Sequence, residues 1–162
     1  MYDFELLIAL LGAVVCLGFL FWQSRRRSRR NWIAIDGSNV LYWRNDTPSL
    51  HTVRLVLHQL EKEGYHPVIW FDANVGYLIK DRYLGPAPLA KALGLSARQV
   101  IVAHKGTPAD TLVIEGAKAL EARIVTNDRF RDWAEEYPQV GDPALFVRGK
   151  MRGEALELTF GT

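Results

Sequence analysis

The stretch that decides the fold of this 162-residue chain is Trp32-Ile33-Ala34-Ile35-Asp36-Gly37-Ser38-Asn39-Val40. It opens with a short apolar run that ends at a carboxylate, and a glycine follows at once. An uninterrupted apolar run of this length is typical of a strand that is buried on both faces. Glycine allows the chain to turn tightly directly after the strand. We therefore expect a buried strand over residues 32–36, with the side chain of Asp36 at its carboxyl end.

Strand-like and helix-like segments alternate after this first strand. Apolar residues recur at three- and four-residue spacings from Leu50 to Leu60, and Gly64 follows, so this pattern predicts an amphipathic helix. Further strands are expected over residues 67–72, 99–103 and 123–126, with a fifth strand or a terminal hairpin over 145–147 and 156–158. Further helices are expected over residues 77–84, 89–93, 107–121 and 128–137. This alternation predicts an α/β fold with a mainly parallel sheet.

An apolar segment precedes this domain. Leu6–Trp22 contains 17 residues without a charged side chain, and five arginines follow between positions 25 and 30. At about 1.5 Å per residue, a helix over residues 4–22 spans roughly 28 Å, close to the thickness of a hydrocarbon core. The acidic start and the arginines after the segment argue against a cleaved signal peptide. We expect a transmembrane anchor over residues 1–24, a basic juxtamembrane linker over 25–31 and a domain over 32–162. The arginines place that domain on the cytoplasmic side of a single-pass membrane protein.

The basic charge of the chain belongs mostly to the linker. The chain has 20 Lys and Arg against 18 Asp and Glu, but from Asn31 onward the numbers are 15 and 16. The domain therefore lacks the general positive charge of many nucleic-acid-binding proteins. The arginine cluster either sets topology and attracts anionic lipids, or it also gathers RNA near the membrane. The one cysteine, Cys16, lies in the apolar segment, which excludes a disulfide framework or a cysteine-based zinc site within one chain.

Several aspartates stand at the ends of the predicted strands, where a binding or catalytic site would form. In parallel sheets, sites lie beyond the carboxyl ends of the strands, and Asp36, Asp72 and Asp128 stand at or just past such ends. Asp132 follows Asp128 by four residues, which places both on one face of the expected helix. Because like charges at that spacing repel, a hard divalent cation would supply the missing compensation. Mg²⁺ prefers oxygen ligands and activates water for attack on phosphate esters.

Asp110 is the fourth candidate ligand. It is expected in the first turn of a helix whose N-cap is Thr107 and whose first residue is Pro108. Asp110 and Asp128 also have an ordinary interpretation as acids at helix starts. An ion pair between Asp132 and a neighbouring arginine, and a simple loop hydrogen bond at Asn39, are further ordinary alternatives. The spacing supports a metal site but does not choose its substrate.

Three segments resemble motifs of a known family. Ile35–Val40 resembles the opening motif of the NYN family of PIN-like nucleases, and Thr126–Asp132 is similar to the second acidic motif of its Regnase-type branch. Thr107–Glu115 resembles the central acidic helix of that family, and order and spacing agree over Trp32–Met151. The resemblance implies a PIN-like (NYN) three-layer sandwich, here preceded by one transmembrane helix. It also implies a metal-dependent endoribonuclease that acts on single-stranded or loop RNA.

The resemblance assigns roles to particular residues. The acidic centre that would bind Mg²⁺, with Mn²⁺ as a second possibility, consists of Asp36, Asp110, Asp128 and Asp132. Asn39 would complete the catalytic set by orienting ligands or water. Members of the branch often carry two adjacent aspartates where this chain has Ala109-Asp110, so the number of metal ions stays open.

RNA contacts are expected from basic side chains near the acids, because such side chains position phosphates. The candidates are Arg129, Arg131, Lys150 and Arg152, followed by Lys80, Arg82, Lys105 and Trp43. Besides RNA, the expected partners are the membrane, through Leu6–Trp22, and further copies of the chain in a homo-oligomer. A catalytically weak, membrane-tethered RNA-binding protein is the alternative function. A phosphatase is disfavoured because Ser38 stands where a second aspartate would be expected.

Overall fold

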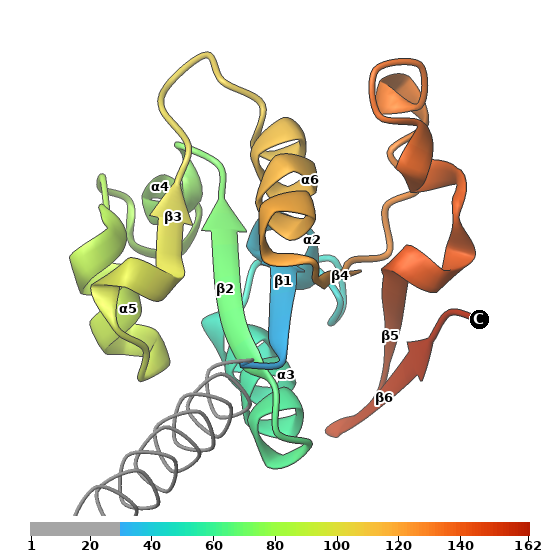
Figure 1. Ribbon diagram of the computed structural model, residues 1–162. Helices are drawn as coiled ribbons and strands as arrows, with labels where there is room; N and C mark the ends of the chain where they lie inside the picture. The colour runs from blue at the N-terminus through green and yellow to red at the C-terminus, as the bar shows by residue number, and fades with distance from the viewer. Residues whose placement is uncertain (1–29) are drawn as a thin grey trace, which may run out of the picture. The chain divides into compact units, whose positions relative to one another are not determined.

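A six-stranded sheet organises residues 30–162, the part of the chain that the computed structural model describes (Figure 1). The strand order is β3-β2-β1-β4-β5-β6. The strands are β1 (Trp32–Asp36), β2 (His66–Phe71), β3 (Val100–Val102), β4 (Arg123–Val125), β5 (Phe146–Arg152) and β6 (Ala155–Phe160). The helices are α2 (Gly37–Val40), α3 (Leu50–Lys62), α4 (Val75–Lys80), α5 (Pro86–Leu93) and α6 (Ala109–Leu120). Four 3₁₀ segments complete the elements: η1 (Ala97–Gln99), η2 (Arg131–Trp133), η3 (Pro138–Gly141) and η4 (Pro143–Leu145).

Strand direction confirms the predicted sheet. β1 lies between β2 and β4 and is parallel to both, and β3 and β5 extend the parallel part on either side. β5 and β6 form the terminal antiparallel hairpin. Since the parallel strands run in the same direction, the segments that follow β1, β2, β3 and β4 all leave at one edge of the sheet.

Helices cover both faces of this sheet. Ile33 and Ile35 of β1 belong to the core on the α3 side, together with Val53. Ala34, between them, belongs to the core on the other face, where it joins Val113 of α6. All three β1 residues are fully buried, which explains why the first strand is apolar without alternation. Figure 1 shows the resulting three layers, with α6 on one face and α3 on the other.

Several element boundaries differ from the sequence predictions. α6 begins at Ala109 and its N-cap is Pro108, whose ψ of 131° is extended, so Thr107 is not the cap. The helix predicted over 77–84 ends at Lys80, because Asp81 adopts a left-handed conformation with φ of 52°. These shifts leave the order of elements unchanged.

The helix predicted over residues 128–137 is wrong. Phe130 adopts a left-handed φ of 49°, and only the short 3₁₀ segment η2 follows it. An Oδ1 atom of Asp128 accepts a hydrogen bond from the Phe130 N–H at 2.7 Å, which stabilises a local turn. The Phe130 ring is buried and packs at 6.1 Å from the ring of Phe146. Asp128 and Asp132 therefore do not share one helix face.

The predicted membrane anchor, Leu6–Trp22, lies outside the described residues. Among residues 30–162, no helix combines the length and the apolar character needed to cross a membrane. Asn31–Thr162 form one contiguous unit.

Candidate active site at the carboxyl edge of the sheet

Asp36 is the most buried acid at this edge. Its side chain is 3% exposed and lies where β1 ends. One carboxylate oxygen accepts the Asn39 N–H at 3.1 Å, and the other accepts the Thr126 hydroxyl at 2.9 Å. Burial raises the pKa of Asp36 from 3.8 to about 7, against the lowering effect of these hydrogen bonds. The negative charges of Asp110 and Asp72 raise the pKa further.

Asp110 faces the same space from α6. It is half-buried in the first turn of the helix, and the Trp133 indole N–H donates to its Oδ2 at 3.2 Å. Burial raises the pKa of Asp110, and the charges of Asp128, Asp72 and Asp132 raise it as well. The first turn of α6 and the segment after β4 therefore converge on Asp36.

Five acids thus interact electrostatically, and we call them the acidic centre. They come from β1, the ends of β2 and β4, the start of α6 and η2: Asp36, Asp72, Asp110, Asp128 and Asp132. Asp72 was absent from the predicted site. Its N–H donates to the Ser38 hydroxyl at 2.8 Å, which ties the end of β2 to the turn after β1. Its position just after a strand was the available signal in the sequence.

A half-buried arginine, Arg148, holds the segment that carries Asp128. The Arg148 guanidinium donates to the carbonyl oxygen of Thr126 at 2.8 Å and also to that of Asp128. It lies 4.3 Å from the centre of the Phe146 ring, and burial lowers its pKa. The Asp128 N–H donates to the Thr126 hydroxyl at 3.0 Å. Sequence reasoning missed Arg148, since its partners are backbone carbonyls about twenty residues away.

Asn39 also positions this segment. Its side-chain oxygen accepts the Asn127 N–H at 2.9 Å and the Trp43 indole N–H at 2.7 Å. The Asn127 side chain exchanges two hydrogen bonds with the backbone of Gly149, at 2.8 and 3.1 Å. Gly149 in turn packs against Trp43 so closely that an added Cβ would lie 1.8 Å from the ring. Asn39 thus links β1 to the β4–β5 region, while its contact with a ligand or water stays a prediction.

The predicted RNA-binding arginines lie in two places. Arg129 and Arg131 are exposed and lie between the two acids of the segment after β4. Within residues 30–162, neither forms an ion pair with Asp132, so that ordinary alternative is not observed. Lys150 and Arg152 are exposed on β5, and Arg152 forms an ion pair with Glu157 at 3.1 Å.

The acidic centre fits a hard cation by its chemistry. All its side-chain donors are carboxylate oxygens, the ligands that Mg²⁺ prefers. Within residues 30–162, no three His, Cys, Asp or Glu side chains lie together closely enough to enclose an ion. Mg²⁺ usually keeps several waters and contacts only one or two carboxylates, so the arrangement accommodates it. A cation would also compensate the buried charge of Asp36.

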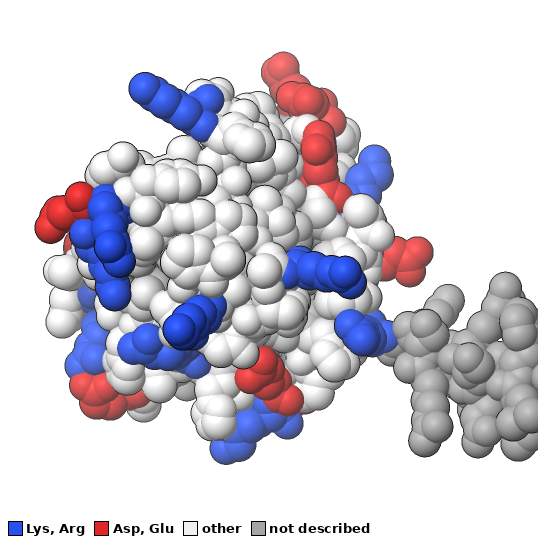
Figure 2. Space-filling model, turned by 90° about the vertical axis from the view of Figure 1, so that its left-hand side faces the viewer, with Lys and Arg blue, Asp and Glu red and all other residues white. Residues whose placement is uncertain are grey.

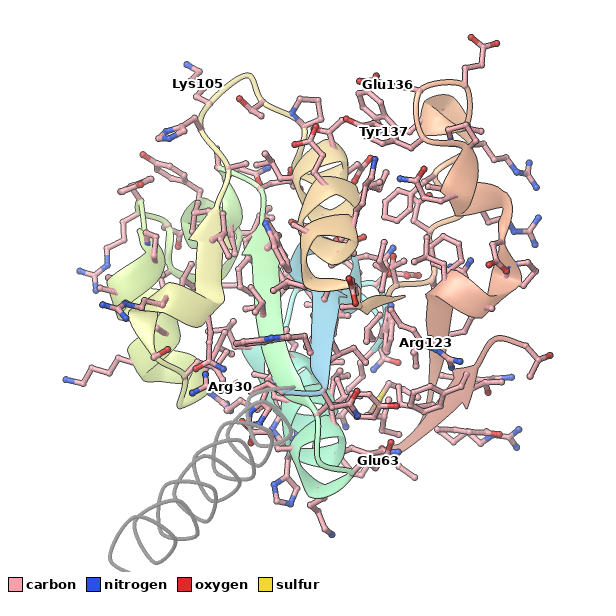
Figure 3. All side chains as sticks on the ribbon, viewed as in Figure 1. Arg30, Glu63, Lys105, Arg123, Glu136 and Tyr137 are labelled. Atoms are coloured by element: carbon pink, nitrogen blue, oxygen red, sulfur yellow. The ribbon has the colours of Figure 1, made fainter. Side chains whose placement is uncertain are left out.

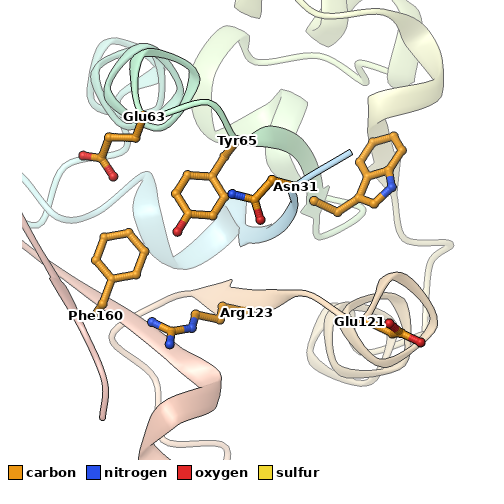
Figure 4. A pocket seen from close by; sticks show the side chains of 7 residues that line it. Asn31, Glu63, Tyr65, Glu121, Arg123 and Phe160 are labelled. Carbon is orange, nitrogen blue, oxygen red and sulfur yellow. The ribbon is translucent and has the colours of Figure 1, made fainter. Parts of the chain in front are cut away.

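A pocket at the opposite edge of the sheet is separate from these acids. It has a volume of about 550 Å³ and lies beside the starts of β1 and β4, with Asn31 and Arg123 in its wall. Figure 4 shows the Arg123 side chain next to Phe160, whose ring centre is 5.5 Å from the guanidinium. Figure 3 shows Arg123 and Glu63 at one end of the domain and Lys105 and Tyr137 at the other.

Comparisons with known proteins agree with this architecture. The family described as "Zc3h12a-like Ribonuclease NYN domain" matches residues 29–143. A crystal structure of nuclear proteinaceous RNase P 2 (PRORP2) from A. thaliana is similar, with a TM-score of 0.64 and 19% sequence identity. A second structure of Arabidopsis thaliana nuclear protein-only RNase P 2 has a TM-score of 0.63 and 16% identity. Both similarities cover 93% of this chain but only 35% of the other, and at this identity they show the fold alone. Among curated proteins, none matches the chain.

Proposed function

The chain belongs to the family of Zc3h12a-like ribonuclease NYN domains, and from this premise we propose that it is a membrane-anchored, metal-dependent endoribonuclease. The acidic centre would hydrolyse phosphodiester bonds within RNA. Membership of the family makes RNA the substrate class. Metal dependence and the anchor are the parts that go beyond the family.

The observation that carries the catalytic proposal is the environment of Asp36. A carboxylate that is 3% exposed and repelled by neighbouring acids costs stability, and such groups cluster at functional sites. A divalent cation bound to the carboxylate would offset that cost by compensating its negative charge. Mg²⁺, with Mn²⁺ as a possible substitute, would bind among Asp36, Asp110, Asp128 and Asp132 through one or two carboxylates and several waters, with Asp72 nearby. The bound ion supplies an activated water and neutralises charge on the phosphoryl group.

The chain's own residues keep these carboxylates in place. The Thr126 hydroxyl and the Asn39 N–H orient the two oxygens of Asp36. The Trp133 indole orients Asp110, and Arg148 fixes the backbone on both sides of Asn127. Such contacts hold the ligands before substrate arrives, which lowers the cost of reaching the productive geometry.

RNA would be held by exposed cations beside the acids. Arg129 and Arg131 lie between Asp128 and Asp132 in the chain and are both exposed, so they can contact phosphates close to the acidic centre. Lys150 and Arg152 are weaker candidates, because Arg152 already pairs with Glu157. Single-stranded or loop RNA is the expected form, since its bases and backbone can enter an irregular edge of a protein.

The location of the enzyme rests on its sequence. We propose that Leu6–Trp22 crosses the membrane once, with the domain on the cytoplasmic side. A reporter fused after Thr162 tests this: it should be active in the cytoplasm, and activity only outside would contradict the proposed topology. The mass of the detergent-solubilised protein tests whether the chain assembles into a homo-oligomer.

A cleavage assay tests the catalytic proposal. The full chain in detergent should cleave end-labelled single-stranded RNA with Mg²⁺ or Mn²⁺, and chelation should stop the reaction. Asp36→Asn should reduce the rate by about 100-fold or more, because an electrostatic catalytic contact commonly contributes that much. Asp46→Asn is the control, since Asp46 is exposed, lies outside the acidic centre and has a φ of 48° that asparagine tolerates. Cleavage that persists in an Asp36→Asn, Asp128→Asn variant would show that the acids are not the site.

An RNA-binding protein without catalysis is the second candidate. Ala109, which stands where family members often carry another aspartate, is 3% exposed. The chain therefore has fewer acids at the start of α6 than many relatives. RNA binding without cleavage in any divalent ion would favour this function.

A further inference from the structure

A second pocket opens on the same edge of the sheet as the acidic centre. It has a volume of about 510 Å³. It is formed by α4, the segment just after α4 and the loops that follow β2 and β3, and its lining residues are Ala73, Asn74, Tyr77, Tyr83, Ala103, His104 and Lys105. This volume is in the range of pockets that hold small ligands.

The pocket and the acidic centre are formed by neighbouring residues of the chain. Ala73 in its wall directly follows Asp72 of that centre. The Ala103 N–H donates to the Phe71 carbonyl oxygen at 2.8 Å, which holds the loops after β2 and β3 side by side. Figure 3 shows Lys105 beyond the tips of these strands. A molecule in the pocket would therefore contact Ala73, the residue next to Asp72 in the chain.

Two tyrosine rings stand open to solvent in this pocket. Tyr77 is 57% exposed and Tyr83 is 62% exposed, the highest values among the large hydrophobic residues of the described chain. The backbone that carries Tyr83 lies close to Gly76 of α4: an added Cβ at Gly76 would lie 2.3 Å from the Arg82 carbonyl oxygen. The close approach keeps the segment that carries Tyr83 against α4. Exposed aromatic side chains held in this way are typical of a binding surface.

The charge of the pocket is positive. Its lining contains a lysine and a histidine but no carboxylate. Within residues 30–162, Lys105 and His104 form no ion pair, so the Lys105 ammonium is available to an anion. Figure 2 shows this side of the molecule, where an uncharged area is bordered by Lys and Arg side chains and also by Asp and Glu side chains.

We propose that this pocket binds one unpaired nucleotide of the RNA substrate, a proposal that rests on the function proposed above. The base stacks on Tyr77 or Tyr83, as bases of single strands do on aromatic side chains. Lys105 contacts the adjoining phosphate, and the side chains of Asn74 and His104 offer hydrogen-bond partners to the base edge. A base inside a duplex cannot reach the rings, so the pocket selects single-stranded RNA next to the point of cleavage.

Binding measured without metal tests this pocket apart from catalysis. Fluorescein-labelled single-stranded RNA is titrated with the full chain in a chelator, and the Kd is taken from fluorescence anisotropy. Tyr77→Ala and Tyr83→Ala remove a ring each, and at least one should raise the Kd about five-fold or more. The matched variants Tyr77→Phe and Tyr83→Phe keep the ring and should bind like the parent protein. Unchanged affinity in both alanine variants would overturn the proposal.

An abasic scan of the RNA locates the bound nucleotide and guards against misfolded variants. Removal of one particular base should weaken binding by the parent protein, and the sensitive alanine variant should show no further loss at that position. Equal losses in the parent and in both alanine variants would overturn the proposal, as would absence of RNA binding by the parent. Ring-dependent binding without cleavage in Mg²⁺ or Mn²⁺ would support the pocket while contradicting the endoribonuclease function. Cleavage together with RNA binding that does not depend on either ring would support the endoribonuclease function while contradicting the pocket.

Discussion

At the scale of single residues, opposing effects determine the pKa of Asp36. Burial favours its protonated form, whereas the Thr126 hydroxyl and the Asn39 N–H favour the carboxylate. Burial prevails, and the pKa rises to about 7. Near neutral pH a small change in pH therefore changes the protonation of Asp36, and the proposed cation would favour the carboxylate.

The pH dependence of stability follows from this pKa. In the unfolded chain Asp36 releases its proton near its ordinary value of 3.8, but in the folded protein only near 7. Between these values the folded state binds more protons, so the Asp36 contribution to the free energy of unfolding falls as pH rises from about 4 to 7. Above pH 7 Asp36 is ionised in both states, so its contribution to the free energy of unfolding no longer changes with pH.

Asp36→Asn removes that contribution, because asparagine keeps an acceptor but does not ionise. In a chelator, the Tm of the variant relative to the parent should rise by several degrees between pH 4.5 and pH 8, at roughly 4 °C per kcal/mol. Thermal melts followed by circular dichroism at both pH values measure it. A Tm difference that stays constant with pH would mean that Asp36 does not carry a raised pKa.

Thr126 is the second residue on which the site depends. Its side chain is fully buried, donates to Asp36 and accepts the Asp128 N–H. Thr126→Val keeps the shape but leaves both partners unsatisfied, so we expect a destabilisation of about 1.5–3 kcal/mol and a ribonuclease rate at least about ten-fold lower. Urea unfolding and the cleavage assay measure these effects. Thr126→Ser restores the hydroxyl and should recover most of the activity; a valine variant as active as the parent would exclude the role.

At the scale of elements, the segment between β4 and η2 depends on β5. The Asn127 side chain pairs with the Gly149 backbone as a neighbouring strand would. The Trp43 ring covers Gly149 and donates to Asn39, which in turn accepts the Asn127 N–H. The geometry of Asp128 thus rests on contacts from three separate parts of the chain.

Gly149→Ala should disturb this arrangement. The added methyl would lie 1.8 Å from the Trp43 ring, so the ring must move and its hydrogen bond to Asn39 is lost. We expect a destabilisation of about 1–3 kcal/mol, altered tryptophan fluorescence and reduced cleavage. Gly141→Ala is the matched control, because an added Cβ there meets no atom within 4 Å. Equal stability of the two variants would contradict the proposed packing.

The same segment shows which features local sequence signals do not predict. The strand ending at Asp36 was predictable because its buried run and following glycine are local. The helix after Asp128 was predicted from equally local signals, but the burial of Phe130 against Phe146, sixteen positions away, determines a different backbone. Asp72 was recognised as a strand-end acid, yet its place in the acidic centre depends on where α6 begins in space. Arg148 gave no signal, because it contacts backbone carbonyls.

At the scale of the whole molecule, charge is distributed unevenly. From Asn31 onward, the chain has 15 Lys and Arg residues and 16 Asp and Glu residues. We expect a near-neutral domain to bind RNA through a few placed cations and bound metal, because it lacks a general positive field. Its anchor and cytoplasmic location remain predictions from Leu6–Trp22 and the arginines that follow.

The salt dependence of RNA binding tests this distribution. Replacement of Arg129 and Arg131 by glutamine should reduce the slope of log Kd against log salt by roughly 1.4, about 0.7 for each lost phosphate contact. Anisotropy titrations at several salt concentrations in a chelator measure the slope. Arg98→Gln is the control, because Arg98 lies in η1 before the start of β3. The same slope for parent and double variant would remove both arginines from the RNA path.

The most direct test of the central claim uses a circular single-stranded RNA, which only cleavage at an internal phosphodiester can open. The full chain with Mg²⁺ or Mn²⁺ should convert the circle to a linear product, and Asp46→Asn should do so at the parent rate. Asp36→Asn combined with Asp128→Asn should leave the circle intact. Circles that stay closed with the parent protein in both ions, or that open equally fast with the double variant, would contradict the account.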